Sequence, residues 1–154
     1  MSVVSGAELM LAAQRLPRGQ AVETDIWRRR DQNGNYRESA ERNAVCEGVR
    51  DRVEFADGDA RGLAFPTEFF DVIVSNLTIH NNAEMEERRQ ALNEAVRVLR
   101  IYGRLRIVDD RADRYGDVLR EAGCTDVTVR GTRLANVVRH PRTPLGLDGG
   151  VQAR

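Results

Sequence analysis

The chain has 154 residues, a formal net charge of zero and no lysine, so arginine supplies every basic side chain apart from two histidines. This length fits a single domain, and the interleaved charges leave no broad basic surface for nucleic acid or for an anionic membrane. A small molecule is therefore the expected ligand, and the absence of lysine excludes a phosphate-loop lysine, a Schiff-base lysine and a pyridoxal-phosphate anchor.

Metal and membrane chemistry are disfavoured as well. The side chains that most often bind transition metals lack the spacing of a metal site; they are Cys46, His80, Cys124 and His140. The longest apolar runs are too short to cross a bilayer. Two cysteines without a signal peptide are typical of a reducing compartment, where we expect both to be small buried apolar residues. We therefore expect a soluble, cytoplasmic protein with no metal.

The first half of the chain alternates between helical and strand-like segments. Apolar residues at helical spacing predict a helix over 7–16, and QAVETDI at 20–26 predicts a short strand. A second helix is predicted over 36–49, where Gly48 marks its end, and a second strand at 51–60 runs into a polar loop.

The second half contains the most apolar run of the chain, FFDVIVSNLTI at 69–79. It predicts a strand covered on both faces, and we place it at the centre of a sheet. The remaining predicted elements are a helix at 82–100, a strand at 103–110, a helix at 114–123 closed by Gly123, and strands at 124–130 and 134–138.

Helices and strands that alternate in this way are typical of a mostly parallel sheet with helices on both faces. We expect one domain over residues 1–140 and a flexible tail over 141–154, whose glycine, proline and polar residues favour disorder. In such sheets a ligand binds beyond the carboxyl ends of the strands, so the residues that follow each strand are the candidates for the site.

Acidic and polar residues stand at the carboxyl ends of four of the predicted strands. They are Asp25 with Ile26, the segment from Asp57 to Ala60, Ser75 with Asn76, and Asp109 with Asp110. A carboxylate at a strand end can accept two hydrogen bonds from a ribose diol, and an acid followed by a small residue can hold an adenine edge. The alternative is that these residues form the turns and helix caps that follow every strand.

Four segments, in this order and spacing, resemble the class I S-adenosylmethionine-dependent methyltransferases of small molecules: AVETDIW, GDARGLAFP, FFDVIVSNLTIHN and EAVRVLR…GRLRIVDD. The resemblance runs from about Gly6 to Arg130. It implies a Rossmann-like three-layer α/β sandwich, S-adenosylmethionine as the cofactor and methyl transfer to a small-molecule acceptor.

The resemblance also implies a cofactor site of six residues. They are Asp25 for the ribose hydroxyls, Ile26 and Ala60 for the adenine ring, Asp59 for the adenine amino edge, Ser75 for the methionine part and Gly6 as the remaining glycine of the cofactor loop. Many such enzymes need only alignment of the nucleophile and exclusion of water, so no catalytic residue is assigned.

His80, close behind the central strand, has two interpretations. An imidazole titrates near neutrality, so His80 is a candidate general base or a residue of the acceptor pocket. It is also a candidate cap for the loop to the next helix, and the sequence shows no partner for it. Asp109 and Asp110 likewise either face the acceptor or cap the helix that follows.

The chain departs from the family at its start. The family opens with an apolar strand and a loop of two or three glycines, but here only Val3 and Val4 precede Ser5 and Gly6. The expected fold is therefore N-terminally truncated, and loss of a central strand would leave a gap of about 9–10 Å with unpaired backbone groups on both sides. We expect the neighbours to close together, another strand to fill the gap, or the native chain to begin further upstream.

Two smaller departures lie near the third-last predicted strand. The turn before it is RIYG, where the family commonly has a Pro-Gly-Gly type of turn, and Arg106 stands where an apolar residue is expected.

Three functions are weighed against this pattern. The first is methyl transfer from S-adenosylmethionine to a small molecule, impaired by the incomplete loop. The second is a non-catalytic remnant or interaction module, which predicts a homo-oligomer because an incomplete sheet exposes pairing edges. The third, a nicotinamide-dependent oxidoreductase, is less favoured because no repeated-glycine fingerprint is present.

Overall fold

The computed structural model describes residues 2–3, 6–16, 18–26, 37–131 and 134–139. Its strands and helices are β1 (Ser2–Val3), α1 (Gly6–Arg15), β2 (Ala21–Asp25), α2 (Arg37–Cys46), β3 (Val53–Asp57), β4 (Phe70–Asn76), α3 (Met85–Val98), β5 (Leu99–Val108), α4 (Gly116–Glu121), β6 (Cys124–Arg130) and β7 (Leu134–Arg139). Three single turns of 3-10 helix join them: η1 (Arg50–Arg52), η2 (Ile79–Asn81) and η3 (Ala112–Arg114). The tail expected over 141–154 lies outside the described residues.

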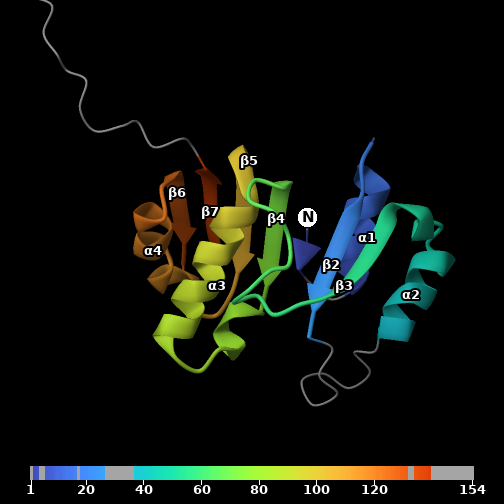
Figure 1. Cartoon of the computed structure of the whole chain (residues 1–154), viewed down its shortest axis with the longest axis horizontal. Coiled ribbons are helices and arrows are strands. Elements are labelled where there is room, and N and C mark those ends of the chain that lie inside the picture. Colours follow the sequence, from blue (N-terminus) through green and yellow to red (C-terminus); the bar gives the residue numbers. More distant parts are fainter. Residues whose placement is uncertain (1, 4–5, 17, 27–36, 132–133, 140–154) are drawn as a thin grey trace, which may run out of the picture.

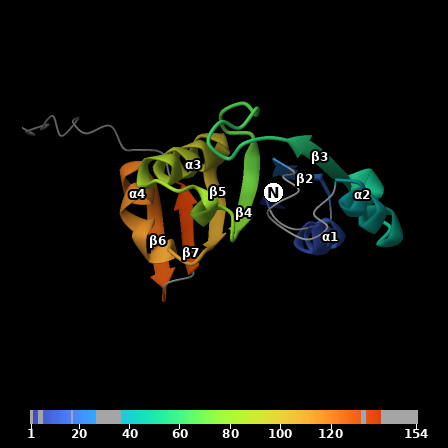
Figure 2. The ribbon, with the colours of Figure 1, turned by 90° about the horizontal axis from the view of Figure 1, so that it is seen from below.

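The strands form two hydrogen-bonded groups. Five of them follow the order β1-β4-β5-β7-β6, and β2 pairs with β3 beside them (Figure 1). The pairs β1–β4, β4–β5 and β2–β3 are parallel, whereas β7 runs antiparallel to both β5 and β6. Figure 2 shows α3 and α4 on one side of the strands and α1 on the other. The Rossmann-like layered α/β fold with a mostly parallel sheet is therefore confirmed.

The first strand of this fold consists of two residues. Ser2 and Val3 pair in register with Val74 and Ser75 of β4, and β1 also contacts β2 on its other side (Figure 1). The gap expected between the neighbours of the first strand is thus filled by the chain's own N-terminal residues. Two residues carry too few amides to complete a ladder with the five-residue β2, so in the described ranges the strands separate into two sheets.

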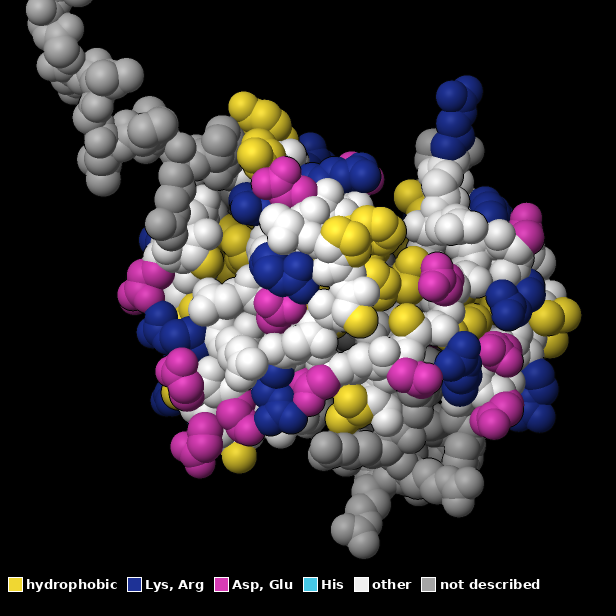
Figure 3. Space-filling view, in the orientation of Figure 1, with side chains coloured by type: hydrophobic (Ala, Val, Ile, Leu, Met, Phe, Trp, Pro, Cys, Tyr) yellow, Lys and Arg dark blue, Asp and Glu magenta, His cyan; other side chains and the backbone are white. Residues whose placement is uncertain are grey.

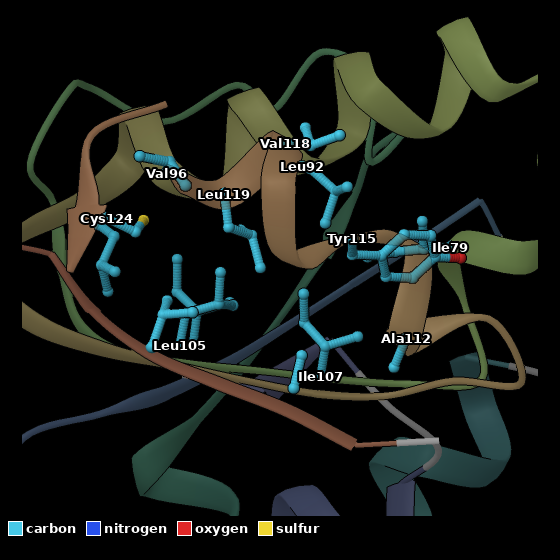
Figure 4. Close-up of a cluster of buried hydrophobic side chains, with 14 of the residues drawn as sticks. Ile79, Leu92, Val96, Leu105, Ile107, Ala112, Tyr115, Val118, Leu119 and Cys124 are labelled. Carbon is cyan, nitrogen blue, oxygen red and sulfur yellow. The ribbon is translucent and has the colours of Figure 1, made fainter. Parts of the chain in front are cut away.

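The five-stranded sheet buries one face against α3 and α4. Figure 4 shows this core, in which Leu92 and Val96 of α3 meet Leu105 and Ile107 of β5 and Leu119 of α4. Because all five of these side chains are nearly inaccessible to water, this cluster accounts for much of the apolar area that folding buries.

The opposite face of β4 and β5 is exposed. Val72 lies in register with Arg104, and Val74 with Arg106; both arginines are exposed, and 42% of Val72 is exposed. The expectation that the most apolar strand is covered on both faces is therefore wrong for the described part of the chain. Arg106 is tolerated in the middle of β5 because its side chain points away from the core.

A second, smaller core joins the two-stranded sheet to α1 and α2. Its largest buried side chains are Leu9, Met10, Val49, Val53 and Phe55. Gly48 ends the α2 segment with φ of 66°, a left-handed conformation that favours glycine, as the sequence predicted.

The segment that joins α3 to β5 differs from the prediction. β5 begins at Leu99, directly after the helix, and the register between β4 and β5 shifts between Phe70 and Val72. Within the extra residues Tyr102 has φ of 64°. The predicted burial of both cysteines is half right, because Cys124 is buried and Cys46 is exposed.

The surface shown in Figure 3 carries mixed charge. Arginine and acidic side chains alternate over this face, and hydrophobic side chains gather near its middle, between the α3 side and the β2–β3 side. None of the helices in the described ranges has the length and apolarity that crossing a bilayer requires.

Candidate functional site

Asp25 and the loop after β3 meet at the ends of the two-stranded sheet. Asp25, the last residue of β2, lies in register with Asp57, and the amide of Gly58 donates to the carbonyl oxygen of Asp25 at 3.1 Å. Asp25 is partly buried, while 44% of the neighbouring Ile26 is exposed. A carboxylate and an accessible apolar side chain therefore lie next to each other at this strand end.

Gly58 is the residue that permits this close approach. A Cβ atom at position 58 would lie 2.4 Å from the side-chain oxygen of Thr24, which is inside any real contact distance. Glycine therefore lets the backbone of the β3 loop pack against β2. The sequence analysis did not assign Gly58 a role.

Asp59 is held by an arginine. Arg61 donates to both carboxylate oxygens of Asp59, with its Nη2 atom 2.6 Å from Oδ2, and its Nη1 atom donates to Glu87 of α3 at 2.6 Å. Ala60 lies between the two partners and is partly buried. This network fixes the β3 loop against the start of α3.

Ser75 and Gly6 lie near the middle of the strand order. Ser75 is buried, pairs with Val3 on one side and Ile107 on the other, and shares a face of β4 with Ile73. Gly6 is the first residue of α1. The six predicted site residues therefore lie at the ends of β2, β3 and β4 and at the start of α1.

Leu77, which the sequence analysis passed over, directly follows β4. Its φ is 51°, about half of it is exposed (47%), and its amide donates to the carbonyl oxygen of Val108 at 2.7 Å. A non-glycine residue in this left-handed conformation is strained, and such strain is common at functional sites. Leu77 thereby presents an apolar surface at the carboxyl end of β4.

His80 has a partner that the sequence did not reveal. Asp109, the residue after β5, accepts a hydrogen bond from the backbone amide of His80 at 3.0 Å, and its Oδ2 atom lies 3.3 Å from the His80 Nδ1 atom. Asp109 is completely buried, and about 30% of the His80 side chain is exposed. The two residues are 29 positions apart in the chain, which is why neither showed a partner in the sequence.

The other carboxylate oxygen of Asp109 is also occupied. The Tyr115 hydroxyl donates to Oδ1 at 3.1 Å, and the backbone amide of Arg111 donates to it at 3.3 Å. Figure 4 shows the Tyr115 ring inside the core with its hydroxyl toward Ile79, the residue before His80. Burial, followed by the charge of Asp109, raises the pKa of Tyr115, so the phenol keeps the proton that it donates.

Arg88 of α3 holds the segment that carries His80 from the other side. Its guanidinium, although the residue is buried, donates to the carbonyl oxygens of Asn82 at 2.8 Å, Ala83 at 3.1 Å and His80 at 3.5 Å. These bonds tie the turn η2 and the loop after it to the first turns of α3. In the sequence, Arg88 is one of several charged residues in the helix predicted over 82–100, and nothing local singles it out.

Two polar side chains in β2 lack such partners. Glu23 and Thr24 are buried, and the Glu23 Oε2 and Thr24 Oγ1 atoms are the two buried side-chain atoms without a hydrogen-bond partner among the described residues. Burial, followed by the charge of Asp25, raises the pKa of Glu23 to about 8.

A family model described as a methyltransferase domain matches residues 4–107. The chain belongs to this methyltransferase family. The match includes α1 and the ends of β2, β3 and β4, and it stops at Ile107 in β5, before Asp109; it leaves the nicotinamide alternative without support.

A curated relative agrees with this assignment. The ubiquinone/menaquinone biosynthesis C-methyltransferase UbiE of Bradyrhizobium sp. (strain BTAi1) is 38% identical over 74 residues, which are 48% of this chain and 28% of UbiE. The chain therefore matches about a quarter of that relative.

Solved structures share the fold. A SAM-dependent methyltransferase from Aquifex aeolicus superposes with a TM-score of 0.65 at 18% identity, over 89% of this chain and 78% of that chain. PigF with SAH (TM-score 0.65, 16% identity) covers 87% of this chain and 47% of PigF, and the [4+2]-cyclase SpnF (TM-score 0.64, 20% identity) covers 82% and 51%. The chain thus spans about half the length of these last two proteins.

Proposed function

We propose that the chain binds S-adenosylmethionine at the carboxyl ends of β2, β3 and β4 and transfers its methyl group to a small-molecule acceptor. The observation that carries this proposal is the junction of Asp25 with the β3 loop, where the Gly58 amide donates to the Asp25 carbonyl oxygen at 3.1 Å. This junction places two acidic strand ends side by side in a member of a methyltransferase family.

The residues at this edge suit the chemistry of the cofactor. The Asp25 carboxylate would accept hydrogen bonds from the two ribose hydroxyls, and the exposed side chain of Ile26 would cover one face of the adenine. Asp59 would accept from the adenine amino group with Ala60 against the ring, although Arg61 already occupies part of the Asp59 carboxylate. The α1 start at Gly6 and the strand end at Ser75 would hold the methionine part.

The cofactor supplies an electrophilic methyl group on a sulfonium, so the chain has to bind it, align the acceptor and exclude water. UbiE, a C-methyltransferase by name, and PigF, solved with SAH, are relatives or neighbours whose names support this choice. We place this activity in a single domain over residues 1–140 in the cytoplasm, with a small molecule as the acceptor.

Titration calorimetry with S-adenosylhomocysteine tests the proposal. We expect saturable binding by the wild-type chain and at least tenfold weaker binding by Asp25→Ala, because loss of one charge-assisted hydrogen bond costs about 1.5–3 kcal/mol. The matched control is Asp117→Asn in α4, whose carboxylate is exposed and pairs with Arg120. A folded wild-type sample that gives no heat at millimolar ligand would sink the proposal.

A second function, a non-catalytic module of the same fold, is favoured by one observation. The Asp59 carboxylate accepts from Arg61 on both oxygens, so it has less capacity left for an adenine. This alternative predicts a homo-oligomer that does not bind S-adenosylhomocysteine. Light scattering of the calorimetry sample, together with the binding result, distinguishes the non-catalytic module from the methyltransferase.

A further inference from the structure

We propose that His80 is the general base of the methyl transfer and that the acceptor is a small molecule with a weakly acidic hydroxyl group, a phenol or an enol. The inference rests on the proposed function and extends it to the side of the site formed by β4 and β5. Two carboxyl ends of neighbouring parallel strands meet there, with His80 after β4 and Asp109 after β5.

The orientation of the His80 ring is set by Asp109. The Nδ1 atom lies 3.3 Å from the Asp109 Oδ2 atom. Because an ionised carboxylate only accepts hydrogen bonds, this contact favours the tautomer with its proton on Nδ1 and its lone pair on Nε2. About 30% of the His80 side chain is exposed, while Asp109 is completely buried. Among the described residues, no protein group bonds to Nε2, so this nitrogen is available to a bound molecule.

The support behind the ring is rigid. Asp109 accepts from the His80 amide, from the Tyr115 hydroxyl and from the Arg111 amide, so both of its oxygens have fixed donors. Arg88 donates to the carbonyl oxygen of His80 and to the two carbonyls beyond it. A histidine that serves only as a loop cap needs one of these contacts, whereas here the backbone around the ring is held from two sides and the ring itself is partly exposed.

This arrangement suits an acceptor that must lose a proton. The acceptor O–H bond breaks and its proton bonds to Nε2; the electron pair on oxygen, or on a ring carbon conjugated with it, bonds to the methyl carbon, while the C–S bond electrons remain on the departing S-adenosylhomocysteine. When a ring carbon is methylated, its own proton is lost to water afterwards. The imidazolium is stabilised by the adjacent Asp109 carboxylate until it releases its proton to solvent.

The charged and titratable groups around the ring come from three elements. Asp109 stands at the end of β5, Arg88 reaches the turn η2 from α3, and Tyr115 and Arg111 lie in the segment that follows β5. Any pH dependence of the reaction therefore has to be assigned with variants at these positions.

The decisive variant is His80→Asn. An asparagine amide can still donate to Asp109 in place of Nδ1 but has no basic nitrogen in place of Nε2, so a structural role survives the change and a catalytic role does not. We expect unchanged binding of S-adenosylhomocysteine, an unchanged melting temperature, a fall in kcat of about 100- to 10,000-fold and loss of the acidic limb of the pH profile of kcat/KM. A rate within threefold of wild type would overturn the proposal.

A readout without turnover is the tautomer of His80, measured by nitrogen NMR on ¹⁵N-histidine-labelled protein loaded with S-adenosylhomocysteine. His80→Asn identifies the signal against that of His140. We expect the neutral ring to carry its proton on Nδ1, and Asp109→Asn, but not the control Asp110→Asn, to change the tautomer ratio. A neutral ring protonated on Nε2 in the wild-type chain contradicts the inference.

The acceptor class is tested with hydroquinone, phenol and 4-hydroxybenzoate, each against the amine that replaces its hydroxyl group, at saturating S-adenosylmethionine. We expect methylation of at least one hydroxyl compound and none of the amines. If the chain binds S-adenosylhomocysteine but methylates only amines, or no hydroxyl compound, the acceptor assignment is wrong while the proposed cofactor site stands. If it fails to bind S-adenosylhomocysteine, the proposed function itself fails.

Discussion

Asp109 and Glu23 are both buried acids, yet their surroundings differ. Asp109, at the end of β5 in the five-stranded sheet, has donors on both oxygens. Glu23 lies in the middle of β2 in the two-stranded sheet. Its Oε2 atom has no hydrogen-bond partner among the described residues, and the hydroxyl oxygen of the adjacent Thr24 has none either. The acceptor side of the proposed site is therefore pre-organised, whereas the cofactor side holds unsatisfied polar groups.

The difference follows from the strands next to each acid. β5 pairs with β4 on one side and β7 on the other, and α3 and α4 pack over it, so the loops at its end are fixed. Within the residues that the structure describes, β2 pairs only with β3, and the two-residue β1 pairs with β4. We expect the two-stranded part to be the less stable part and to gain more from a bound cofactor.

The largest loss of stability is expected from removing the guanidinium of Arg88, which holds the segment around His80. Arg88→Met keeps the length of the side chain but leaves the carbonyls of Asn82, Ala83 and His80 without their donor. Three partly buried bonds to a charged donor are lost together and the buried guanidinium is removed, so the free energy of unfolding should fall by about 3 kcal/mol. Urea unfolding measures it. The control is Arg89→Met, whose exposed pair with Glu121 is worth about 0.5 kcal/mol or less.

Glu23→Gln is expected to raise the free energy of unfolding by an amount that depends on pH. The pKa of Glu23 is about 8 in the folded chain, against 4.5 as its ordinary value. Between these values the unfolded chain releases the proton that the folded chain keeps, so the wild-type free energy of unfolding falls as pH rises from about 4.5 to about 8 and then levels off.

Glu23→Gln has no such titration. At pH 8.5 we expect it to be about 1–3 kcal/mol more stable than wild type, and near pH 4 the two should be similar. Chemical unfolding across this range, with Glu54→Gln on the exposed part of β3 as the control, gives the answer. If the free energies of unfolding of wild type and Glu23→Gln change in parallel with pH, Glu23 does not keep its proton in the folded chain above its ordinary pKa.

Removal of one hydroxyl group should lower the free energy of unfolding at Tyr115, beside Asp109, but should leave it unchanged or raise it at Thr24, beside Glu23. Tyr115→Phe takes a donor from Asp109 and should cost about 1–2 kcal/mol. Thr24→Val removes a hydroxyl that has no partner in the described part of the chain, and it should be neutral or stabilising by up to about 1 kcal/mol. Thermal unfolding of both variants measures the pair. The contrast between the two sides fails if both variants lose the same stability.

The smallest change in stability is expected at Tyr102, in the RIYG segment that stands where the family commonly has a Pro-Gly-Gly type of turn. Tyr102 is 66% exposed and has φ of 64°, so its side chain gains little from burial and strains the backbone. Tyr102→Gly should raise the free energy of unfolding by about 0.5–1 kcal/mol. Tyr102→Ala, which keeps a Cβ, is the control and should not be stabilised.

Much of the element order was predictable from local patterns. Gly48 and Gly123 end helices in left-handed conformations, and the alternation of helices and strands indicated a mostly parallel sheet. The start of β5 at Leu99 was missed because the chain passes from α3 into the strand without a turn residue. The exposed face of β4 was missed because an apolar run does not show whether other elements cover both faces of the strand.

The sequence by itself determined the class of fold, the acidic strand ends and the resemblance to methyltransferases, because these depend on periodicity and on residues close together in the chain. Tertiary structure alone decided what each buried polar group contacts. Arg88 looks like a surface charge of α3 until the carbonyls around it are seen, and His80 meets Asp109 across 29 residues. Hydrogen bonds between distant segments depend on how strands and loops come together, and no local pattern specifies that.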